Sequence, residues 1–329
     1  MGGGAWGTAL ASVVAKNGHS VTLWAREDEV VEAVNRAREN TVFLPGVGLP
    51  EGIRATTDLH EAVRSAQVVV NVVPSQFVRS VWQEVAHELD ASVLVVSASK
   101  GIETRTLERM DEVLGELLGD PIMERFTVLS GPSFALEVAQ EAPTLVVAGS
   151  RDLQAAEEVQ ALFQNHFFRV YTNQDVIGVE LGGALKNVIA VGAGVAAGLG
   201  FGHNTMAALI TRGLAEMTRL GIAMGARRET FAGLAGMGDL VLTCTGELSR
   251  NRTVGFRLGQ GESLEEILGP MRTVAEGVRT VQAVQVLAHR HEVEMPITAE
   301  VHAMLMEGRP PREALENLMS RAPKPEDWT

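Results

Sequence analysis

The first half of the chain alternates short apolar, β-branched runs with amphipathic helical patterns, and this alternation restricts the fold more than any other feature. Residues 68–73 and 93–98 are apolar at successive positions rather than at every second one. Strands with that pattern are covered on both faces, as in a parallel sheet with helices on either side. The sequence therefore predicts a Rossmann-type α/β fold, a doubly wound and mostly parallel sheet.

Past Asn173 the pattern changes, and the rest of the chain reads as helices separated by Gly, Pro and Asn signals. We predict a Rossmann-like domain over residues 1–178 and an all-α domain over residues 179–329. Strands are expected at residues 21–24, 53–56, 68–73, 93–98, 126–129, 144–148 and 169–171. Helices are expected at residues 29–38, 77–88, 107–118, 153–163, 174–199, 205–224, 264–268, 281–289, 299–306 and 311–319.

The composition of the chain limits which classes of binding partner and which cellular compartment are expected. The 329 residues carry 28 Lys and Arg against 41 Asp and Glu, a net charge of −13, which argues against nucleic acid or an anionic membrane as the main partner. The single cysteine, Cys244, excludes an internal disulfide and fits a reducing compartment. No secretory signal, membrane span or metal-ligand cluster is recognisable, so we predict a cytoplasmic protein without a metal site.

The chain opens on a glycine-rich turn that reads G-x-G-x-x-G, with Gly2, Gly4 and Gly7 at the motif positions. Such glycines allow a tight turn, a close approach of backbone N–H groups to a pyrophosphate and close packing of the next helix. A helix over residues 8–16, ended by Gly18, and a strand over residues 21–24 complete the expected context. The alternative is a plain flexible turn.

The strand that should precede this turn is absent from the sequence, which begins at Met1. That strand is central in a Rossmann sheet, and its loss leaves backbone donors and acceptors unpaired in the core. We therefore expect an apolar strand of several residues to lie natively upstream of Met1.

Arg26 is the first polar residue after the strand at residues 21–24, where an NAD-preferring fold usually carries an acid. A guanidinium there suits the 2′-phosphate of NADP. Glu27 and Asp28 follow closely and keep NAD open as the alternative. We expect NADP or NAD, with NADPH favoured, although Arg26 could also be a solvated residue at a helix start.

Two further strand ends carry groups suited to a polar ligand, because ligands bind at the carboxyl ends of parallel strands. Lys100 follows the strand at residues 93–98, and the turn Gly131-Pro132-Ser133 follows the strand at residues 126–129. A solvated loop lysine and a helix-capping serine are the competing interpretations.

Lys186 lies in a helical pattern that offers its ammonium no polar face. Its helical neighbours are Gly182, Gly183, Ile189, Ala190 and Ala193. Burial disfavours the charged form of a lysine and lowers its pKa toward the range useful for proton transfer. We predict that Lys186 is an acid/base group, with a surface lysine as the alternative.

Downstream, Asp239 follows a glycine-rich turn and can pair with a buried lysine, although it could also cap a helix. Ser249, Arg250 and Asn251 stand in a row at a predicted helix start, where a hydroxyl, a guanidinium and an amide can hold a phosphate. The alternative for this triplet is a surface cap beside a solvated arginine.

Together these stretches closely resemble the bacterial NAD(P)-dependent glycerol-3-phosphate dehydrogenases, over nearly the whole chain. The resemblance is carried by residues 4–9, 74–76, 99–102, 131–135, 179–187, 238–240, 249–252 and 276–277. It implies a cofactor site of Gly2, Gly4, Ala5, Trp6, Gly7, Arg26, Lys100, Ala135, Arg250, Val274 and Glu276. It implies a substrate site of Lys100, Gly131, Ser133, Lys186, Asp239, Ser249, Arg250 and Asn251, with Lys186 catalytic. Ala5 stands where the family usually has serine, so only a backbone contact survives there.

The implied function is the reversible NAD(P)H-dependent reduction of dihydroxyacetone phosphate to sn-glycerol 3-phosphate, which supplies glycerophospholipid synthesis. Two alternatives remain open at this point. One is a dehydrogenase of the β-hydroxyacid or 6-phosphogluconate type, and the other is a dinucleotide-binding protein without turnover. The expected partners are a small-molecule substrate and a second copy of the chain in a homodimer, with no nucleic acid or integral membrane contact.

Overall fold

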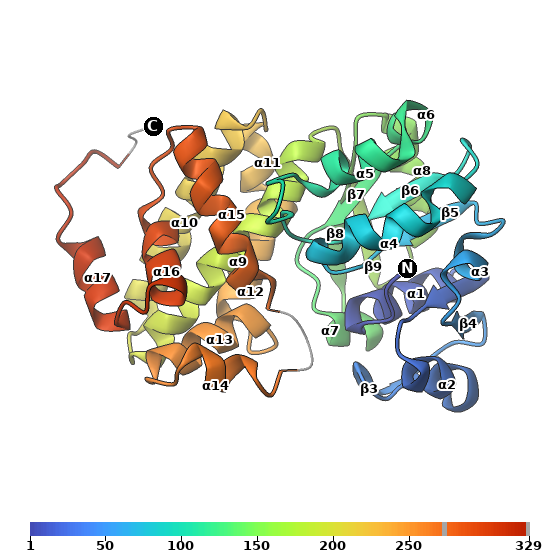
Figure 1. Cartoon of the computed structure of the whole chain (residues 1–329), viewed down its shortest axis with the longest axis horizontal. Coiled ribbons are helices and arrows are strands. Elements are labelled where there is room, and N and C mark those ends of the chain that lie inside the picture. The colour runs from blue at the N-terminus through green and yellow to red at the C-terminus, as the bar shows by residue number, and fades with distance from the viewer. Residues whose placement is uncertain (272–274, 327–329) are drawn as a thin grey trace. The chain divides into compact units, whose positions relative to one another are not determined.

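The computed structural model describes residues 1–271 and 275–326, and the chain divides into two compact units (Figure 1). Unit 1 comprises Met1–Lys100 and Glu108–Val179, and unit 2 comprises Gly101–Leu107 and Glu180–Thr329. The sequence pattern did not separate Gly101–Leu107 from its neighbours, whereas the structure groups this segment with unit 2.

The largest sheet of unit 1 has five strands, in the order β5-β6-β7-β8-β9. Its strands are β5 (Val68–Asn71), β6 (Leu94–Ser97), β7 (Thr127–Ser130), β8 (Thr144–Ser150) and β9 (Phe168–Asn173). All neighbouring pairs are parallel except β7 and β8, which run antiparallel with Val128 opposite Gly149. The predicted Rossmann-type, mostly parallel sheet is confirmed.

A second, two-stranded parallel sheet pairs β1 (Val21–Trp24) with β4 (Ile53–Thr56). Met1 and Gly2 join it to the larger sheet through backbone bonds. The Met1 amino group donates to Val70 O at 2.8 Å, the Val72 N–H to Met1 O at 2.8 Å and the Gly2 N–H to Trp24 O at 3.0 Å. Burial lowers the pKa of the Met1 amino group to about 5.

An antiparallel hairpin of β2 (Glu39–Asn40) and β3 (Leu44–Gly48) was not anticipated. Sequence reasoning missed it because β2 has only two residues and β3 contains Pro45 and Gly46, which are signals for turns. The hairpin places Asn40, which is fully buried, beside the start of the first helix.

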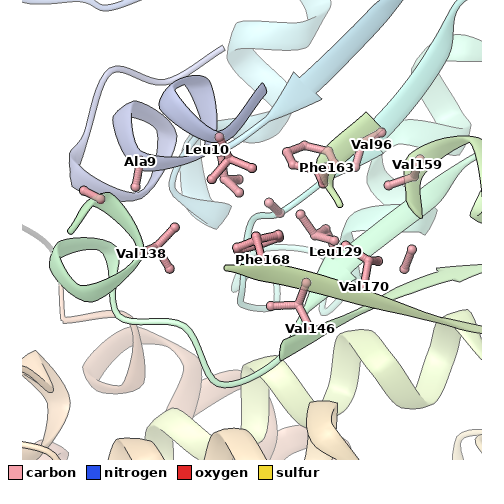
Figure 2. Packing of buried hydrophobic residues seen from close by; sticks show 14 of the residues in the cluster. Ala9, Leu10, Val96, Leu129, Val138, Val146, Val159, Phe163, Phe168 and Val170 are labelled. Carbon is pink, nitrogen blue, oxygen red and sulfur yellow. The ribbon is translucent and has the colours of Figure 1, made fainter. Parts of the chain in front are cut away.

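The main core of unit 1 lies on one face of the larger sheet (Figure 2). Leu10 of α1 (Ala5–Lys16), Val138 of α7 (Ala135–Ala139) and Phe163 of α8 (Leu153–Phe163) pack over strand residues that include Leu129 and Phe168. The opposite face is also covered, since every residue of β6 and β7 is buried. Cover on both faces explains why these strands are buried along their whole length and apolar except for Ser97, Thr127 and Ser130 at their ends.

Further helices surround the sheets of unit 1. They are α2 (Asp28–Ala37), α3 (Leu59–Val63), α4 (Val78–Val85), α5 (Met110–Leu118), α6 (Asp120–Met123) and the short turns η1 (Ser75–Phe77) and η2 (Ala86–Glu88). The single helix predicted at residues 77–88 is thus divided among η1, α4 and η2. The helix predicted from residue 107 begins at Met110, because Leu107 has a left-handed φ of 68° and Arg109 with Glu112 forms a capping box.

Unit 2 is helical, as predicted. Its helices are α10 (His203–Ala223), α11 (Arg228–Ala232), the π-helical η3 (Leu234–Gly238), α12 (Asp239–Thr245), α13 (Arg250–Gly259), α14 (Leu264–Leu268), α15 (Glu276–Arg290), α16 (Pro296–Met306) and α17 (Pro311–Met319). The long helix α9 (Val176–Gly198) begins in unit 1 and continues into unit 2. Within the described residues, α9 alone has the length and hydropathy of a membrane span, but 94% of its apolar window is buried in protein, as in a core helix.

Glycines bring α9 and α13 into direct backbone contact. A Cβ at Gly194 would stand 2.0 Å from Arg252 O, and one at Gly198 would stand 2.2 Å from Phe256 O. In the reverse direction, a Cβ at Gly255 would stand 1.9 Å from Val191 O. None of these positions has room for a side chain, so the glycines allow the short distance between the two helices.

Candidate active site

In unit 1 the predicted site residues lie in the glycine-rich turn and at the ends of the strands, and the turn is described first. Gly2 adopts a φ of +111°, which other residues rarely adopt, and a Cβ at Gly7 would stand 1.9 Å from Gly2 O. A Cβ at Gly3 would stand 2.4 Å from the Cβ of Ala25 at the end of β1. These positions are glycine because the turn folds back on itself and on β1.

Gly4 differs from its neighbours, since no atom lies within 4 Å of the position that its Cβ would take. It is the N-cap residue of α1, which has no side-chain cap and no acidic residue in its first turn. Helix N–H groups without a side-chain acceptor, beside open space, fit the pyrophosphate of a dinucleotide. The residues present therefore fit NAD or NADP.

The other predicted cofactor residues of this region lie around the turn. Ala5 and Trp6 form the start of α1 and are half-buried against the core of unit 1. Arg26 is exposed just beyond the end of β1. This exposure is consistent with both interpretations of Arg26. The guanidinium could bind an anionic ligand such as the 2′-phosphate of NADP, or it could simply be solvated.

At the ends of β6 and β7 the structure brings three predicted residues together. Lys100 Nζ and Ser133 Oγ each donate to Gly131 O at 3.0 Å. Gly131 has a φ of +140°, a backbone conformation that favours glycine. Ser133 does not cap α7, whose N-cap residue is Phe134. Ala135 is the first residue of that helix.

Lys186 lies at the centre of the polar site of unit 2, in the middle of α9, and is only 6% exposed. Its Nζ donates to Asp239 Oδ1 at 2.5 Å and to Thr243 Oγ1 at 2.8 Å. Asp239 is 1% exposed and is the first residue of α12, not its cap. The surface-lysine and helix-cap alternatives are thereby excluded, and the buried pair that the sequence indicated forms.

Thr243 was missed by sequence reasoning. It stands one helical turn after Asp239 on α12, and its hydroxyl donates to Asp239 O at 2.6 Å while accepting from Lys186. The spacing of four residues from Asp239 was the available signal. Cys244 beside it is buried, and burial raises its thiol pKa to about 12, so the thiol is not a nucleophile near neutral pH.

A close contact between backbones sets the distance between these helices. A Cβ at Gly182, one turn before Lys186 on α9, would stand 2.4 Å from Ala235 O of η3. The glycine therefore allows the turn ahead of Asp239 to approach the helix that carries the lysine.

The predicted phosphate triplet lies at the start of α13. Ser249 is the N-cap residue, and its Oγ accepts from the Arg252 N–H at 3.2 Å. Arg250 is the first residue of the helix and is exposed. The serine therefore has a structural role as a cap. Burial of the Arg250 guanidinium lowers its pKa, and the Glu276 carboxylate opposes that shift.

Asn251 is buried and connects three helices rather than pointing to an open space. Its Nδ2 donates to Asn187 Oδ1 of α9 at 2.9 Å, and its Oδ1 accepts from the Gly277 N–H of α15 at 2.9 Å. Glu276, a predicted cofactor residue, is the first residue of α15. Val274, the other one in this stretch, lies outside the described residues.

Within residues 1–271 and 275–326, no group of three or more His, Cys, Asp or Glu side chains is arranged to hold a metal ion. The predicted site groups described above are the glycine-rich turn, the Lys100 cluster, the Lys186–Asp239 pair and the start of α13. A Rossmann-type unit with a dinucleotide turn and a helical unit with a buried lysine define a nicotinamide-dependent dehydrogenase class.

Comparison with known proteins identifies the family within this class. Residues 1–156 match the N-terminal region of the NAD-dependent glycerol-3-phosphate dehydrogenases and residues 175–316 match their C-terminal region. The chain belongs to this family.

Individual relatives are similar over nearly their full lengths. Glycerol-3-phosphate dehydrogenase (NAD(P)+) of Geobacter metallireducens is 60% identical over 326 residues, which is 99% of this chain and 97% of the relative. The same enzyme of Geobacter sulfurreducens is 57% identical over 328 residues, 100% of this chain and 98% of the relative. The crystal structure of glycerol-3-phosphate dehydrogenase from Coxiella burnetii has a TM-score of 0.92 at 39% identity and covers 97% of each chain.

Proposed function

We propose that this chain catalyses the reversible NAD(P)H-dependent reduction of dihydroxyacetone phosphate to sn-glycerol 3-phosphate, a precursor of glycerophospholipids. The relatives described above are named for glycerol 3-phosphate and NAD(P)+. The observation that carries the proposal is Lys186 Nζ, buried in an apolar helix and held by Asp239 and Thr243.

Unit 1 would hold the dinucleotide. The N–H groups at the start of α1 would bind the pyrophosphate, with Gly2, Gly4 and Gly7 keeping the turn close, and Arg26 would favour NADPH over NADH. When bound, the reduced nicotinamide supplies a hydride for the keto carbon. The remaining cofactor contacts are assigned to Ala5, Trp6, Lys100, Ala135, Arg250, Val274 and Glu276.

Lys186 would supply the proton. Its ammonium donates to the keto oxygen, which both polarises the carbonyl and neutralises the alkoxide as it forms. The Asp239 carboxylate and the Thr243 hydroxyl hold Nζ in place through their hydrogen bonds. The lysine is then protonated again from solvent, and the reverse reaction uses it as a base.

The substrate phosphate would bind at the start of α13. Arg250 offers a guanidinium there, and helix N-termini favour anions. Ser249 and Asn251 shape this end of the helix through the contacts described above. Lys100, Gly131 and Ser133 would provide further polar contacts to the substrate.

The location and assembly of the enzyme are also proposals. The acidic balance of the chain, its one buried cysteine and the burial of α9 support a cytoplasmic enzyme. A homodimer stays a prediction that light scattering coupled to size exclusion would check.

The test is absorbance at 340 nm with NADPH or NADH and dihydroxyacetone phosphate. Oxidation of NADPH that depends on this substrate, faster than oxidation of NADH, is the expected result. In the reverse direction with NADP+ or NAD+, oxidation of β-hydroxyacids in preference to glycerol 3-phosphate would favour the β-hydroxyacid dehydrogenase alternative. Binding of NADPH without turnover of any of these substrates in either direction would favour the dinucleotide-binding alternative.

A further inference from the structure

Asn40 is a fully buried polar residue to which neither the sequence nor the family assigns a role here. Its Nδ2 donates to Gly3 O at 2.8 Å and to Thr8 Oγ1 at 2.8 Å. Its Oδ1 accepts from the Phe43 N–H at 3.0 Å. One side chain thus connects the glycine-rich turn, the first helix and the β2–β3 hairpin.

The turn needs a polar partner from elsewhere because it has none of its own. Three successive glycines, Gly2 to Gly4, provide no side chain to fix their peptide planes. Among the described residues, the side chains that donate to the Gly3 carbonyl are Asn40 at 2.8 Å and Thr8 at 3.5 Å. The Asn40 amide is therefore the main polar restraint on this peptide.

Fixing the Gly3 carbonyl also fixes the next N–H. In a planar trans peptide the C=O of one residue and the N–H of the following residue point in opposite directions. Because Gly3 O is directed at Asn40, the Gly4 N–H is directed away from it. Gly4 is the residue beside which the structure leaves open space, at the start of α1.

We propose that Asn40 is a positioning residue for dinucleotide binding, which holds the Gly3–Gly4 peptide with its N–H toward the pyrophosphate. The inference rests on the cofactor role proposed above for the glycine-rich turn. It assigns Asn40 no contact with the substrate and none with the lysine site.

The first experiment compares Asn40→Ala with Asn35→Ala. Asn35 is a matched control, since its side chain also forms two hydrogen bonds to backbone in unit 1, with Ala55 O at 2.9 Å and the Ala55 N–H at 2.8 Å. Losing the restraint in Asn40→Ala should raise the Kd and the KM for NADPH about tenfold. The kcat at saturating NADPH and the KM for dihydroxyacetone phosphate should stay within about twofold of the wild type.

Asn35→Ala should lower the melting temperature without changing the Kd for NADPH. An unchanged Kd in folded Asn40→Ala, or an equal rise in both variants, would overturn the inference. If Asn40→Ala does not fold, Asn40→Asp replaces it. Aspartate keeps the acceptor for the Phe43 N–H and removes the donor to Gly3 O, so the same rise in Kd is expected.

Gly4→Asp tests the underlying cofactor role separately. Gly4 has extended backbone angles as the N-cap residue of α1, where aspartate is well accommodated, so the variant should fold. Its carboxylate would lie where the pyrophosphate is proposed to bind, and NADPH binding should be lost. Retained binding in Gly4→Asp would contradict the cofactor role itself, whereas loss in Gly4→Asp with no change in Asn40→Ala would contradict only the inference about Asn40.

Discussion

The polar sites of the two units are built in opposite ways. In unit 1 the glycine-rich turn offers backbone N–H groups, and side chains are excluded because a Cβ at Gly3 or Gly7 would collide with neighbouring atoms. In unit 2 the groups are side chains, Lys186, Asp239 and Thr243, that come from two helices and are almost fully buried. Substitutions should therefore act on affinity in unit 1 and on turnover in unit 2, and each prediction below tests that separation.

The largest effect is expected from Lys186→Met. Loss of the proton donor should reduce kcat by about 10²–10⁴-fold, while the Kd for NADPH stays unchanged because the turn lies in the other unit. Single-turnover absorbance at 340 nm and fluorescence titration of NADPH would measure the two quantities. Since the variant leaves Asp239 buried without its cation, Lys186→Met/Asp239→Asn is the control for stability. Near-normal turnover in either variant would remove Lys186 from the mechanism.

Arg250→Ala should discriminate between substrates. If the guanidinium binds the phosphate through two charge-assisted bonds of about 1.5–3 kcal/mol each, kcat/KM for dihydroxyacetone phosphate should fall by about 10²–10⁴-fold. The value for unphosphorylated dihydroxyacetone should change far less. Equal losses for both substrates would argue against a phosphate contact.

Thr243→Val should have a smaller effect on the same step. The variant loses the hydroxyl's bond to Asp239 O, within α12, and its bond of 2.8 Å to Lys186 Nζ. The bond to Nζ, worth about 1 kcal/mol, should lower kcat roughly five- to tenfold when it is lost. The KM for NADPH should not change. Thr243→Ser keeps the hydroxyl and should restore kcat, and failure of that rescue would mean that packing, not the hydrogen bond, is responsible.

The smallest effect on catalysis is expected from Glu216, a buried carboxylate of α10 that is far in sequence from the predicted site residues. It accepts from the Ile297 N–H at 2.7 Å, and from the Thr298 N–H and hydroxyl at 3.1 Å each, at the start of α16. Burial raises its pKa to about 7, and these hydrogen bonds oppose the rise only in part.

Because the folded-state pKa lies above the unfolded value of 4.5, Glu216 contributes stability that is complete below pH 4.5 and is lost as the pH rises through 7. A shift of this size corresponds to about 3 kcal/mol between these limits. The Met1 amino group, whose pKa burial lowers to about 5, contributes a slope of opposite sign, so the comparison is between variants. The stability that the wild type has over Glu216→Gln, measured by urea unfolding, should fall by this amount from pH 4.5 to 8, while the pH profile of kcat is the same for both. A difference between the two proteins that does not vary with pH would contradict the assignment.

Most of the fold could be predicted from the sequence because its signals are local. The apolar run at β6 and the breakers around α8 and α17 predicted buried strands and helix limits within a few residues. The β2–β3 hairpin could not be predicted, because a strand of two residues has no periodicity and depends on Asn40 and its contacts with the glycine-rich turn. The start of α5 depends on the left-handed backbone of Leu107, which no residue type there indicated.

The site could be predicted only in part. Lys186 stood out because its helical neighbours are apolar, and Asp239 because a carboxylate followed a glycine-rich turn. Thr243 and Asn40 could not be recognised from the sequence, because threonine is common in helices and asparagine is common near turns. Their importance arises from partners distant in sequence, such as Lys186 and Gly3, which only the folded chain brings near. Whether each site residue performs its assigned role stays a prediction.

The interlocked glycines of α9 and α13 have a consequence for how sequences of this kind can vary. Gly194, Gly198 and Gly255 each face a backbone carbonyl of the other helix, so a methyl group at any one of them would push α13 away and carry Arg250 with it. In a deep mutational scan where cell growth depends on glycerol 3-phosphate made by this enzyme, these glycines should therefore tolerate substitution almost as poorly as Arg250 does. Second-site substitutions that restore growth should lie in the contact between α9 and α13 and should not add charge near the proposed phosphate site. The first substitution changes the distance between the two helices and removes no chemical group of the site.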